Sequence, residues 1–285
     1  MNRRNVLLIA GAAVGIGLLL ILATGLRTVF RPFRESARAV KTENHEFRET
    51  LTGVDIKTFS SDVRFVVSDD GVTRVESVHG DDVKESVEVE NGVLNVRQET
   101  VKKVSIHFFG FGVGDIDSHL TVSLPRGTFE SLKLETASGD VGIPADYSFQ
   151  SAEVATASGS VSFDAQCGKL LVGTASGDVR LREVRADSAS IATASGEVEL
   201  KDTRVTEKLT VATVSGDVEF EHSDAQEMEL ETVSGEVEGT LLTGKSFDVK
   251  TTSGKIEVPA STSGAGRCEI KTVSGDVKLR VDGIL

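Results

Sequence analysis

The stretch Thr174–Leu181, TASGDVRL, decides the fold because it recurs along the chain. Close copies are TASGEVEL from Thr193, TVSGDVEF from Thr213 and TVSGDVKL from Thr272. The threonine of this Thr-x-Ser-Gly string occupies positions 136, 156, 174, 193, 213, 232, 251 and 272, at intervals of 18 to 21 residues. Recurrence at such a near-constant period is typical of stacked repeat architectures.

Short segments of alternating apolar and polar residues flank each string, as in LTVAT before the glycine of one copy and DVRL after that of another. Alternation with a period of two predicts a β-strand on each side of a glycine corner. Each copy contributes one apolar residue at each inward-facing position, so neighbouring copies bury one another's apolar side chains. We therefore predict an all-β protein whose residues 126–285 form a β-solenoid, a parallel β-helix-like stack of about eight rungs of 18–21 residues.

Residues 45–125, which precede the regular repeats, follow the same pattern loosely. IKTFSSDVRFV, at Ile56–Val66, is a degenerate copy in which Ser61 stands where the other copies have glycine. Longer strand-like segments follow, joined by Asp-Gly and Asn-Gly pairs, which favour tight turns. We predict that these residues form an irregular N-terminal β cap, because the open end of a solenoid needs a cover against strand pairing.

The repeated string contains a hydroxyl, a glycine and a carboxylate, so a catalytic role competes with an architectural one. A nucleophilic serine requires a general base within hydrogen-bond reach. Of five histidines, only His222 lies among the regular copies. We predict that the protein is not an enzyme, that the hydroxyls bond to the backbone and to each other, and that the glycines are structural turn residues. These glycines are Gly139, Gly159, Gly177, Gly196, Gly216, Gly235, Gly254 and Gly275.

An acidic residue follows the glycine in most copies, and a second acidic row contains Glu199 and Glu219. Carboxylates stacked about 4.8 Å apart repel one another, and a cation such as Ca²⁺ would relieve that repulsion. The Gly-Gly-x-Gly-x-Asp signature of calcium-binding solenoids is absent from the sequence. We predict solvated acidic rows, with no metal site and no cofactor.

Small residues gather at alternate positions around the threonine in four of the copies. If the threonine points inward, these residues point outward and form a flat patch that could contact another protein or a second copy of the chain. Steric ease at a tight corner explains the same pattern equally well. The residues of this predicted interaction face are Ala155, Ala157, Ala175, Ala192, Ala194 and Ala212.

The chain contains two cysteines, Cys167 and Cys268, which the repeat places on rungs too far apart for a disulfide. It stops about half a rung after the last repeat glycine. We therefore expect the last rung to be an exposed edge or to be covered by Ile284 and Leu285.

Residues 5–26 carry no charge and are rich in leucine, isoleucine, alanine and glycine. A run of this length can cross the apolar core of a bilayer, about 30 Å thick. We predict a short tail at residues 1–4, a transmembrane helix at 5–26 and a basic juxtamembrane linker at 27–44, with a cleaved signal peptide as the alternative. Arginines flank the apolar run on both sides, so the positive-inside rule leaves the orientation open.

The net charge of −13 is unevenly distributed, because residues 1–40 carry six arginines and one glutamate, a net +5, which leaves −18 for the remainder. An acidic domain of this kind repels phosphate, which excludes nucleic acid as a partner.

The apolar run, the IKTFSSDVRFV opening, the Asn-Gly strand pair and the serial rungs together resemble the putative-adhesin family of prokaryotic membrane-anchored β-solenoid domains of unknown function. The resemblance covers residues 45–285 and brings no catalytic residues. It implies a non-catalytic, adhesin-like scaffold or binding protein of the cell envelope, held in the membrane by the N-terminal helix, with the solenoid outside the cytoplasm and a protein or glycan as partner. The alternatives are a self-assembling, polymer-forming envelope scaffold and a carbohydrate-active β-helix enzyme.

Overall fold

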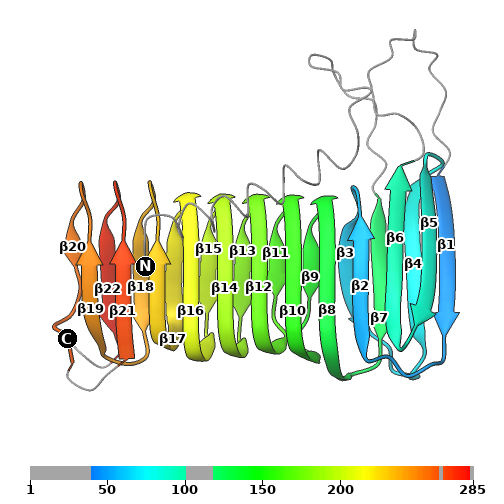
Figure 1. Ribbon diagram of the computed structural model, residues 1–285, viewed down its shortest axis with the longest axis horizontal. Helices are drawn as coiled ribbons and strands as arrows, with labels where there is room; N and C mark the ends of the chain where they lie inside the picture. The colour runs from blue at the N-terminus through cyan, green and yellow to red at the C-terminus, as the bar shows by residue number, and fades with distance from the viewer. Residues whose placement is uncertain (1–39, 101–117, 263–265, 283–285) are drawn as a thin grey trace, which may run out of the picture.

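The computed structural model describes residues 40–100, 118–262 and 266–282. These residues form strands, turns and loops, so none of them belongs to a helix that could cross a membrane. The strands build one elongated stack that runs from β1 at one end to β19 and β20 at the other (Figure 1). The predicted all-β solenoid is confirmed, whereas the predicted tail, transmembrane helix and most of the linker lie outside the described residues.

The strand that leads up to each threonine belongs to one sheet, which we call sheet B. Apart from the antiparallel pair β5 and β6 at one end, its strands pair in parallel, for example Val154 with Val172 and Val172 with Ile191. In spatial order, sheet B consists of β5 (Val83–Glu90), β6 (Val93–Thr100), β2 (Gly53–Thr58), β8 (Gly127–Ser138), β10 (Tyr147–Ser158), β12 (Gln166–Ser176), β14 (Arg185–Ser195), β16 (Arg204–Ser215), the second half of β17 (Val218–Glu231), β21 (Gly266–Lys271) and β19 (Lys245–Lys250).

The strand after each glycine belongs to the opposite sheet, which we call sheet A. In spatial order, sheet A consists of β1 (Val40–Phe47), β4 (Thr73–Gly80), β7 (His119–Leu124), β3 (Asp62–Val67), β9 (Val141–Ile143), β11 (Val161–Phe163), β13 (Val179–Arg182), β15 (Val198–Lys201), the first half of β17, β18 (Val237–Leu241), β22 (Val277–Val281) and β20 (Ile256–Glu257). Each rung therefore crosses from sheet B to sheet A at its glycine corner.

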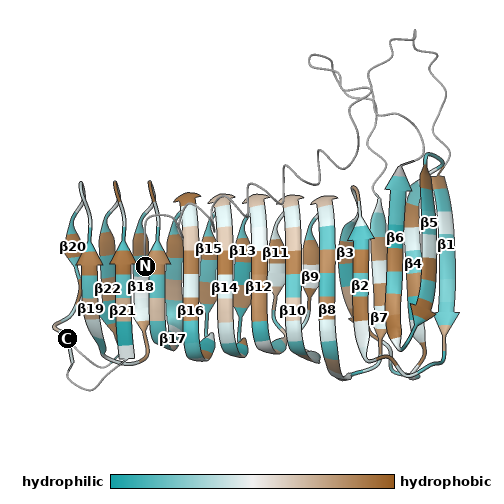
Figure 2. Cartoon of the chain, viewed as in Figure 1, coloured by the Kyte–Doolittle hydropathy of each residue, from teal (hydrophilic) through white to brown (hydrophobic). Residues whose placement is uncertain are grey.

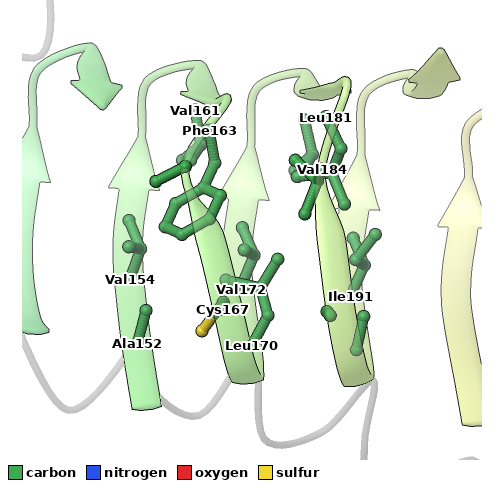
Figure 3. Close-up of a cluster of buried hydrophobic side chains, with 14 of the residues drawn as sticks. Ala152, Val154, Val161, Phe163, Cys167, Leu170, Val172, Leu181, Val184 and Ile191 are labelled. Carbon is green, nitrogen blue, oxygen red and sulfur yellow. The ribbon is translucent and has the colours of Figure 1, made fainter. Parts of the chain in front are cut away.

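The core between the two sheets consists of columns of apolar side chains, to which each rung adds one member. Figure 3 shows Phe163 and Leu181 from sheet A beside Val154, Val172 and Ile191 from sheet B, all at most 1 % exposed. The apolar bands continue from strand to strand along the stack (Figure 2). Full burial of a side chain of this size contributes roughly 1.5–3 kcal/mol. Since the burial comes from neighbouring rungs, the stack is stable only as an assembly of rungs.

The glycine corners are crowded, which explains the recurrence of glycine in the string. A Cβ atom built on Gly177 would lie 2.0 Å from the carbonyl oxygen of Gly159, and one built on Gly159 would lie 2.1 Å from that of Gly139. The φ angle of Gly196 is +147°, but for most of the corner glycines the requirement is space rather than an unusual backbone angle. These corners thus accept only glycine, because the backbone of a neighbouring rung occupies the space that a side chain would need.

The threonine side chains of the string point into the core and are at most 6 % exposed, except for the half-buried Thr251 in the end rung. Thr58 donates a hydrogen bond of 2.9 Å to the hydroxyl of Thr136. Within the described residues, however, the hydroxyls of Thr156, Thr193 and Thr213 are buried without a hydrogen-bond partner. The predicted network of hydroxyls therefore forms only in part, and these side chains act mainly by packing.

The cap confirms the degenerate first copy and adds an antiparallel part. Thr58 pairs with Thr136 across β2 and β8, and a Cβ on Gly139 would meet the carbonyl oxygen of Ser61 at 2.2 Å, so Ser61 occupies the corner position. Asn91 and Gly92 both have positive φ angles, 51° and 79°, in the tight turn of the β5–β6 hairpin. Strand β1 begins at Val40, inside the segment predicted to be linker.

At the C-terminal end, the rungs do not stack in the order of the sequence. Strands β21 and β22, from the last repeat, insert beside β17 and β18, while β19 and β20, from the repeat before it, form the end of the stack. A Cβ on Gly275 would therefore meet Gly235, and one on Gly254 would meet Gly275. The expectation that the last rung is the exposed edge is wrong, because neighbouring repeats are similar enough to accept either partner.

The two cysteines are both buried and free, as predicted. Cys167 lies within strand β12, opposite Phe149 and Ala186. Cys268 lies in β21 between Met228 and Phe247. Burial raises the pKa of the Cys167 thiol to about 11 and that of Cys268 to about 12.

Candidate functional site

The residues of the predicted interaction face lie in two neighbouring rows on the outer face of sheet B. The first row consists of positions that pair across the strands: Glu135, Ala155, Gly173, Ala192, Ala212 and Glu231. Its alanines Ala155, Ala192 and Ala212 are only 4 %, 7 % and 3 % exposed. The prediction that these three form exposed surface is wrong, because a methyl group set between strands about 4.8 Å apart offers little area to a partner.

The second row, which we call the apolar row, occupies the variable position of the Thr-x-Ser-Gly string. Its members Ala157, Ala175 and Ala194 are half-buried, as the prediction requires of an outward position. The row continues through valines that sequence reasoning missed, and Val233 and Val273 are 44 % and 52 % exposed. In spatial order, the apolar row is Ala137, Ala157, Ala175, Ala194, Val214, Val233 and Val273. Comparing this one position over all copies would have revealed the valines.

Backbone hydrogen bonds hold the valine end of the apolar row in place. Ser234 N donates to Val214 O, Ser274 N donates to Val233 O, and both bonds are 2.9 Å long. Leu171, two residues before Gly173 on the outer side of β12, adds a further large apolar side chain that is 38 % exposed. The face therefore combines a fixed backbone with exposed apolar side chains, which is typical of an interaction surface.

Ion pairs close the N-terminal end of this face. Glu135 accepts contacts from Lys57 at 3.2 Å and from Lys133 at 3.1 Å. Burial raises the pKa of Glu135, but hydrogen bonds from the two lysines outweigh burial, and the pKa lies below its ordinary value. Glu135 is therefore ionised at neutral pH.

A second group of ion pairs closes the other end of the face. Lys271 contacts Glu269, and it lies 3.4 Å from Glu231, while Lys208 lies 2.9 Å from Glu229. The hydrogen bond with Glu269 raises the pKa of Lys271, so the lysine stays charged. Apolar residues in the centre and charged residues around them match the anatomy of protein interfaces.

The serines of the string lie at exposed corners, and Ser138, Ser158, Ser176 and Ser195 all face solvent. His222 belongs to a different corner, where it has a φ angle of 48° and its Nε2 atom lies 3.8 Å from Asp282. The arrangement gives the serines no repeated base, and the absence of enzymatic activity stays a prediction.

The aspartates that follow the corner glycine have a structural role. Asp178 Oδ1 accepts a hydrogen bond of 3.0 Å from the backbone N–H of Glu197, and Asp217 Oδ1 accepts one of 2.8 Å from Glu236. The equivalent bond from Lys255 to Asp276 lowers the pKa of Asp276. These carboxylates therefore link successive rungs.

In the second acidic row, which contains Glu199 and Glu219, the carboxylates repel one another. Burial raises the pKa of Glu219 first, and the charges of Glu197, Glu199 and Glu238 raise it further. Lys278 lies opposite Glu238 because β22 is inserted beside β18, so the order of the rungs at the C-terminal end interrupts the acidic row with a cation.

Solved structures of other proteins share this architecture. The chain superimposes on the crystal structure of a putative adhesin from Bacteroides fragilis with a TM-score of 0.54 and 18 % identity, covering 84 % of this chain and 97 % of that one. A putative adhesin from Parabacteroides distasonis gives a TM-score of 0.55 and 13 % identity, covering 85 % and 97 %. At these identities the likeness shows a shared fold.

No curated protein matches the chain. The Toastrack DUF4097 family model matches residues 51–208 and 202–284, which span all of the repeats and the cap apart from β1. The resemblance inferred from the repeated string is therefore confirmed, and the chain belongs to the Toastrack DUF4097 family.

Proposed function

We propose that the protein is a non-catalytic, adhesin-like scaffold of the cell envelope, anchored in the membrane by residues 5–26, that binds a protein or glycan through the outer face of sheet B. The observation that supports this most strongly is the apolar row, whose valines Val233 and Val273 are exposed at the corners just after β17 and β21, where backbone hydrogen bonds link the rungs. A rigid surface of this kind loses little conformational entropy on binding. The solenoid stands outside the cytoplasm in this proposal.

The apolar character of the row fits a protein partner better than a glycan, because valine and alanine offer no hydrogen bonds to sugar hydroxyls. The charged residues around the row, such as Lys57 and Lys271, would then set the orientation of the partner.

The native mass of the full-length chain, extracted from its own cells in mild detergent, tests this function. Wild type is expected to migrate as a complex larger than the monomer, and the double variant Val233→Lys with Val273→Lys is expected to migrate as the monomer. The control variant Ser162→Lys places one lysine on the outer side of β11 in sheet A and should leave the complex intact, whereas either single variant of the pair, Val233→Lys or Val273→Lys, should weaken it. A monomeric wild type, or a complex that the double variant retains, contradicts the proposal.

Self-assembly is the second candidate, and the end of the stack favours it. Strand β20 pairs with β22 alone among the described strands, and its Ile256 is 44 % exposed. An unpaired edge of this kind can add a strand from another molecule. Co-expression of two differently tagged copies separates the candidates, because only self-assembly makes the copies purify together.

A further inference from the structure

The last layer of the core at the cap end of the stack, between the end strands β1 and β5, is partly polar. Phe47, Val87 and Val89 are partly buried and pack against the apolar core. Glu43 and His45 lie on the same side of β1 as Phe47, since residues two apart on a strand face the same way. A core layer that contains ionisable groups requires an explanation, because their burial costs free energy unless they have partners.

Glu43 and His45 of sheet A meet Glu85 of sheet B in this layer. One ligand atom from each of the three residues lies within 4.8 Å of those of the others. The Nε2 atom of His45 is 3.6 Å from Glu85 Oε1 and 3.8 Å from Glu43 Oε2. It is buried and, within the described residues, has no hydrogen-bond partner.

A second histidine is aimed at the same carboxylates. The side chain of His79 is completely buried, and its Nε2 atom lies 3.6 Å from Glu43 Oε1. Its Nδ1 atom lies 2.9 Å from the carbonyl oxygen of Gly80. A carbonyl oxygen accepts a hydrogen bond only from a protonated nitrogen. Nδ1 of His79 therefore carries the proton, and Nε2 carries the lone pair. That atom also lacks a hydrogen-bond partner among the described residues.

The carboxylate of Glu85 is held in position by a chain of hydrogen bonds. Ser77 Oγ donates to Glu85 Oε1 at 2.7 Å, and Gln98 Nε2 donates to Glu85 Oε2 at 2.7 Å. Ser61 Oγ in turn donates to the side-chain oxygen Oε1 of Gln98 at 2.8 Å. Such supporting bonds around a ligand fix its orientation and are characteristic of metal sites.

We propose that Glu43, His45 and Glu85 bind a divalent transition-metal ion, Zn²⁺, and that His79, which lies near Glu43 but outside this group of three, completes the coordination after a side-chain movement. Two imidazoles and two carboxylates suit Zn²⁺, whereas Ca²⁺ takes oxygen ligands. Ligand atoms about 2.05 Å from Zn²⁺ at the tetrahedral angle lie about 3.3 Å apart. Three of the observed separations, of 3.6 and 3.8 Å, are close to that value, and the ligand atoms of the group of three all lie within 4.8 Å of one another, so the side chains would have to close around the ion.

The ion would join the two sheets at the exposed end of the solenoid. Strand β1 pairs only with β4, and β5 pairs only with β6, among the described strands. Glu43 and His45 come from β1, and Glu85 comes from β5. A bound ion therefore ties the last strand of sheet A to the last strand of sheet B, which opposes fraying of both edges.

Titration of the full-length, chelator-treated chain in detergent with Zn²⁺, followed by calorimetry, tests this site. Wild type is expected to bind one ion at this site, and His45→Ala and Glu85→Gln are expected to weaken binding more than about 10-fold. Co²⁺ in place of Zn²⁺ should give the intense visible bands of a tetrahedral ion, and both variants should lose them. His222→Asn is the matched control, since it removes a histidine outside the cluster and asparagine tolerates the left-handed backbone there.

Binding that His45→Ala leaves unchanged, or no Zn²⁺ binding by wild type, would overturn the proposal. His45 is one-third exposed on an edge strand, so its replacement by alanine is expected to leave the fold intact. If Glu85→Gln unfolds, His45→Ala decides the question together with a melting experiment. Zn²⁺ should raise the melting temperature of wild type and not that of His45→Ala. The site is independent of the apolar row, so failure of one leaves the other standing.

Discussion

Replacing Gly177 by alanine should strongly destabilise the protein, because the corner has no room for a side chain. The new Cβ atom would lie 2.0 Å from the carbonyl oxygen of Gly159 and 2.5 Å from its carbonyl carbon. Both atoms are backbone of the neighbouring rung, so no side chain can rotate away. The two rungs would have to separate by about 1 Å to restore ordinary contact distances.

The size of the effect follows from the hydrogen bonds that this separation disrupts. Gly159 N donates to Ser176 O at 3.2 Å and Val161 N donates to Asp178 O at 2.8 Å, both across the same corner. Each bond contributes about 1 kcal/mol net, and the residual strain of overpacking adds about 1–3 kcal/mol. We therefore expect a loss of about 3–5 kcal/mol in the free energy of unfolding.

Gly173→Ala provides a matched control four residues earlier, in strand β12. A Cβ atom there meets nothing within 4 Å, and the position continues a row of alanines. Removing the backbone freedom of glycine should stabilise the protein by about 0.4–1 kcal/mol. Urea unfolding of both full-length variants, followed by circular dichroism, gives the comparison. Free energies of unfolding that agree within about 1 kcal/mol would refute the steric explanation of the repeated glycine.

Three further predictions concern charge and burial. Glu219→Gln should raise the melting temperature at pH 7 and have no effect below pH about 4. The pKa of Glu219 is higher in the folded than in the unfolded protein, so this carboxylate destabilises the fold only when it is ionised. Melting curves at the two pH values test this prediction. Lys245→Met should cost about 3–5 kcal/mol by leaving Asp224 buried without its partner at 2.5 Å, and adding Asp224→Asn should recover part of that loss in urea unfolding. Cys167 and Cys268 should resist thiol reagents in the folded protein and react in urea, because burial raises both pKa values.

A specific result would contradict each of these three predictions. A stabilisation by Glu219→Gln that persists at low pH would mean that repulsion is not the cause. A Lys245→Met variant as stable as wild type would show that the ion pair with Asp224 contributes nothing. Rapid labelling of either thiol in the folded protein would contradict the buried positions of Cys167 and Cys268.

The fold could be predicted because every rung repeats the same local rules. Val154, Val172 and Ile191 occupy one position of the repeat, and that position is buried in every copy except at Val249 in the end rung, which is partly buried. Gly177 and its equivalents mark the corners at which the chain changes sheet. The period of the string thus determines which residues face the core, without knowledge of any tertiary contact.

The order of the rungs could not be predicted, because repeats that obey the same rules fit more than one neighbour. Strand β21 pairs with both β17 and β19, and its Cys268 fits between Met228 and Phe247. The choice rests on specific pairs, such as Lys271 with Glu231, which the periodicity does not report.

The candidate sites, like the fold, could be predicted only in part from the sequence. The apolar row was found only as far as Ala194, because alanine was taken as the signal rather than the position that Val233 and Val273 share. The cluster of His45, His79 and Glu85 was missed because the cap has no repeat, and its antiparallel pairing brings together residues about 35 to 40 positions apart.

Photo-cross-linking in intact cells tests the central claim, that the outer face of sheet B is the functional surface, most directly. A benzophenone amino acid in place of Ala175 should give a discrete covalent adduct, because this position lies in the apolar row. The same probe in place of Ser162, which is equally half-buried on the outer side of sheet A, should give none. Adducts from both positions, or from Ser162 alone, would contradict the account.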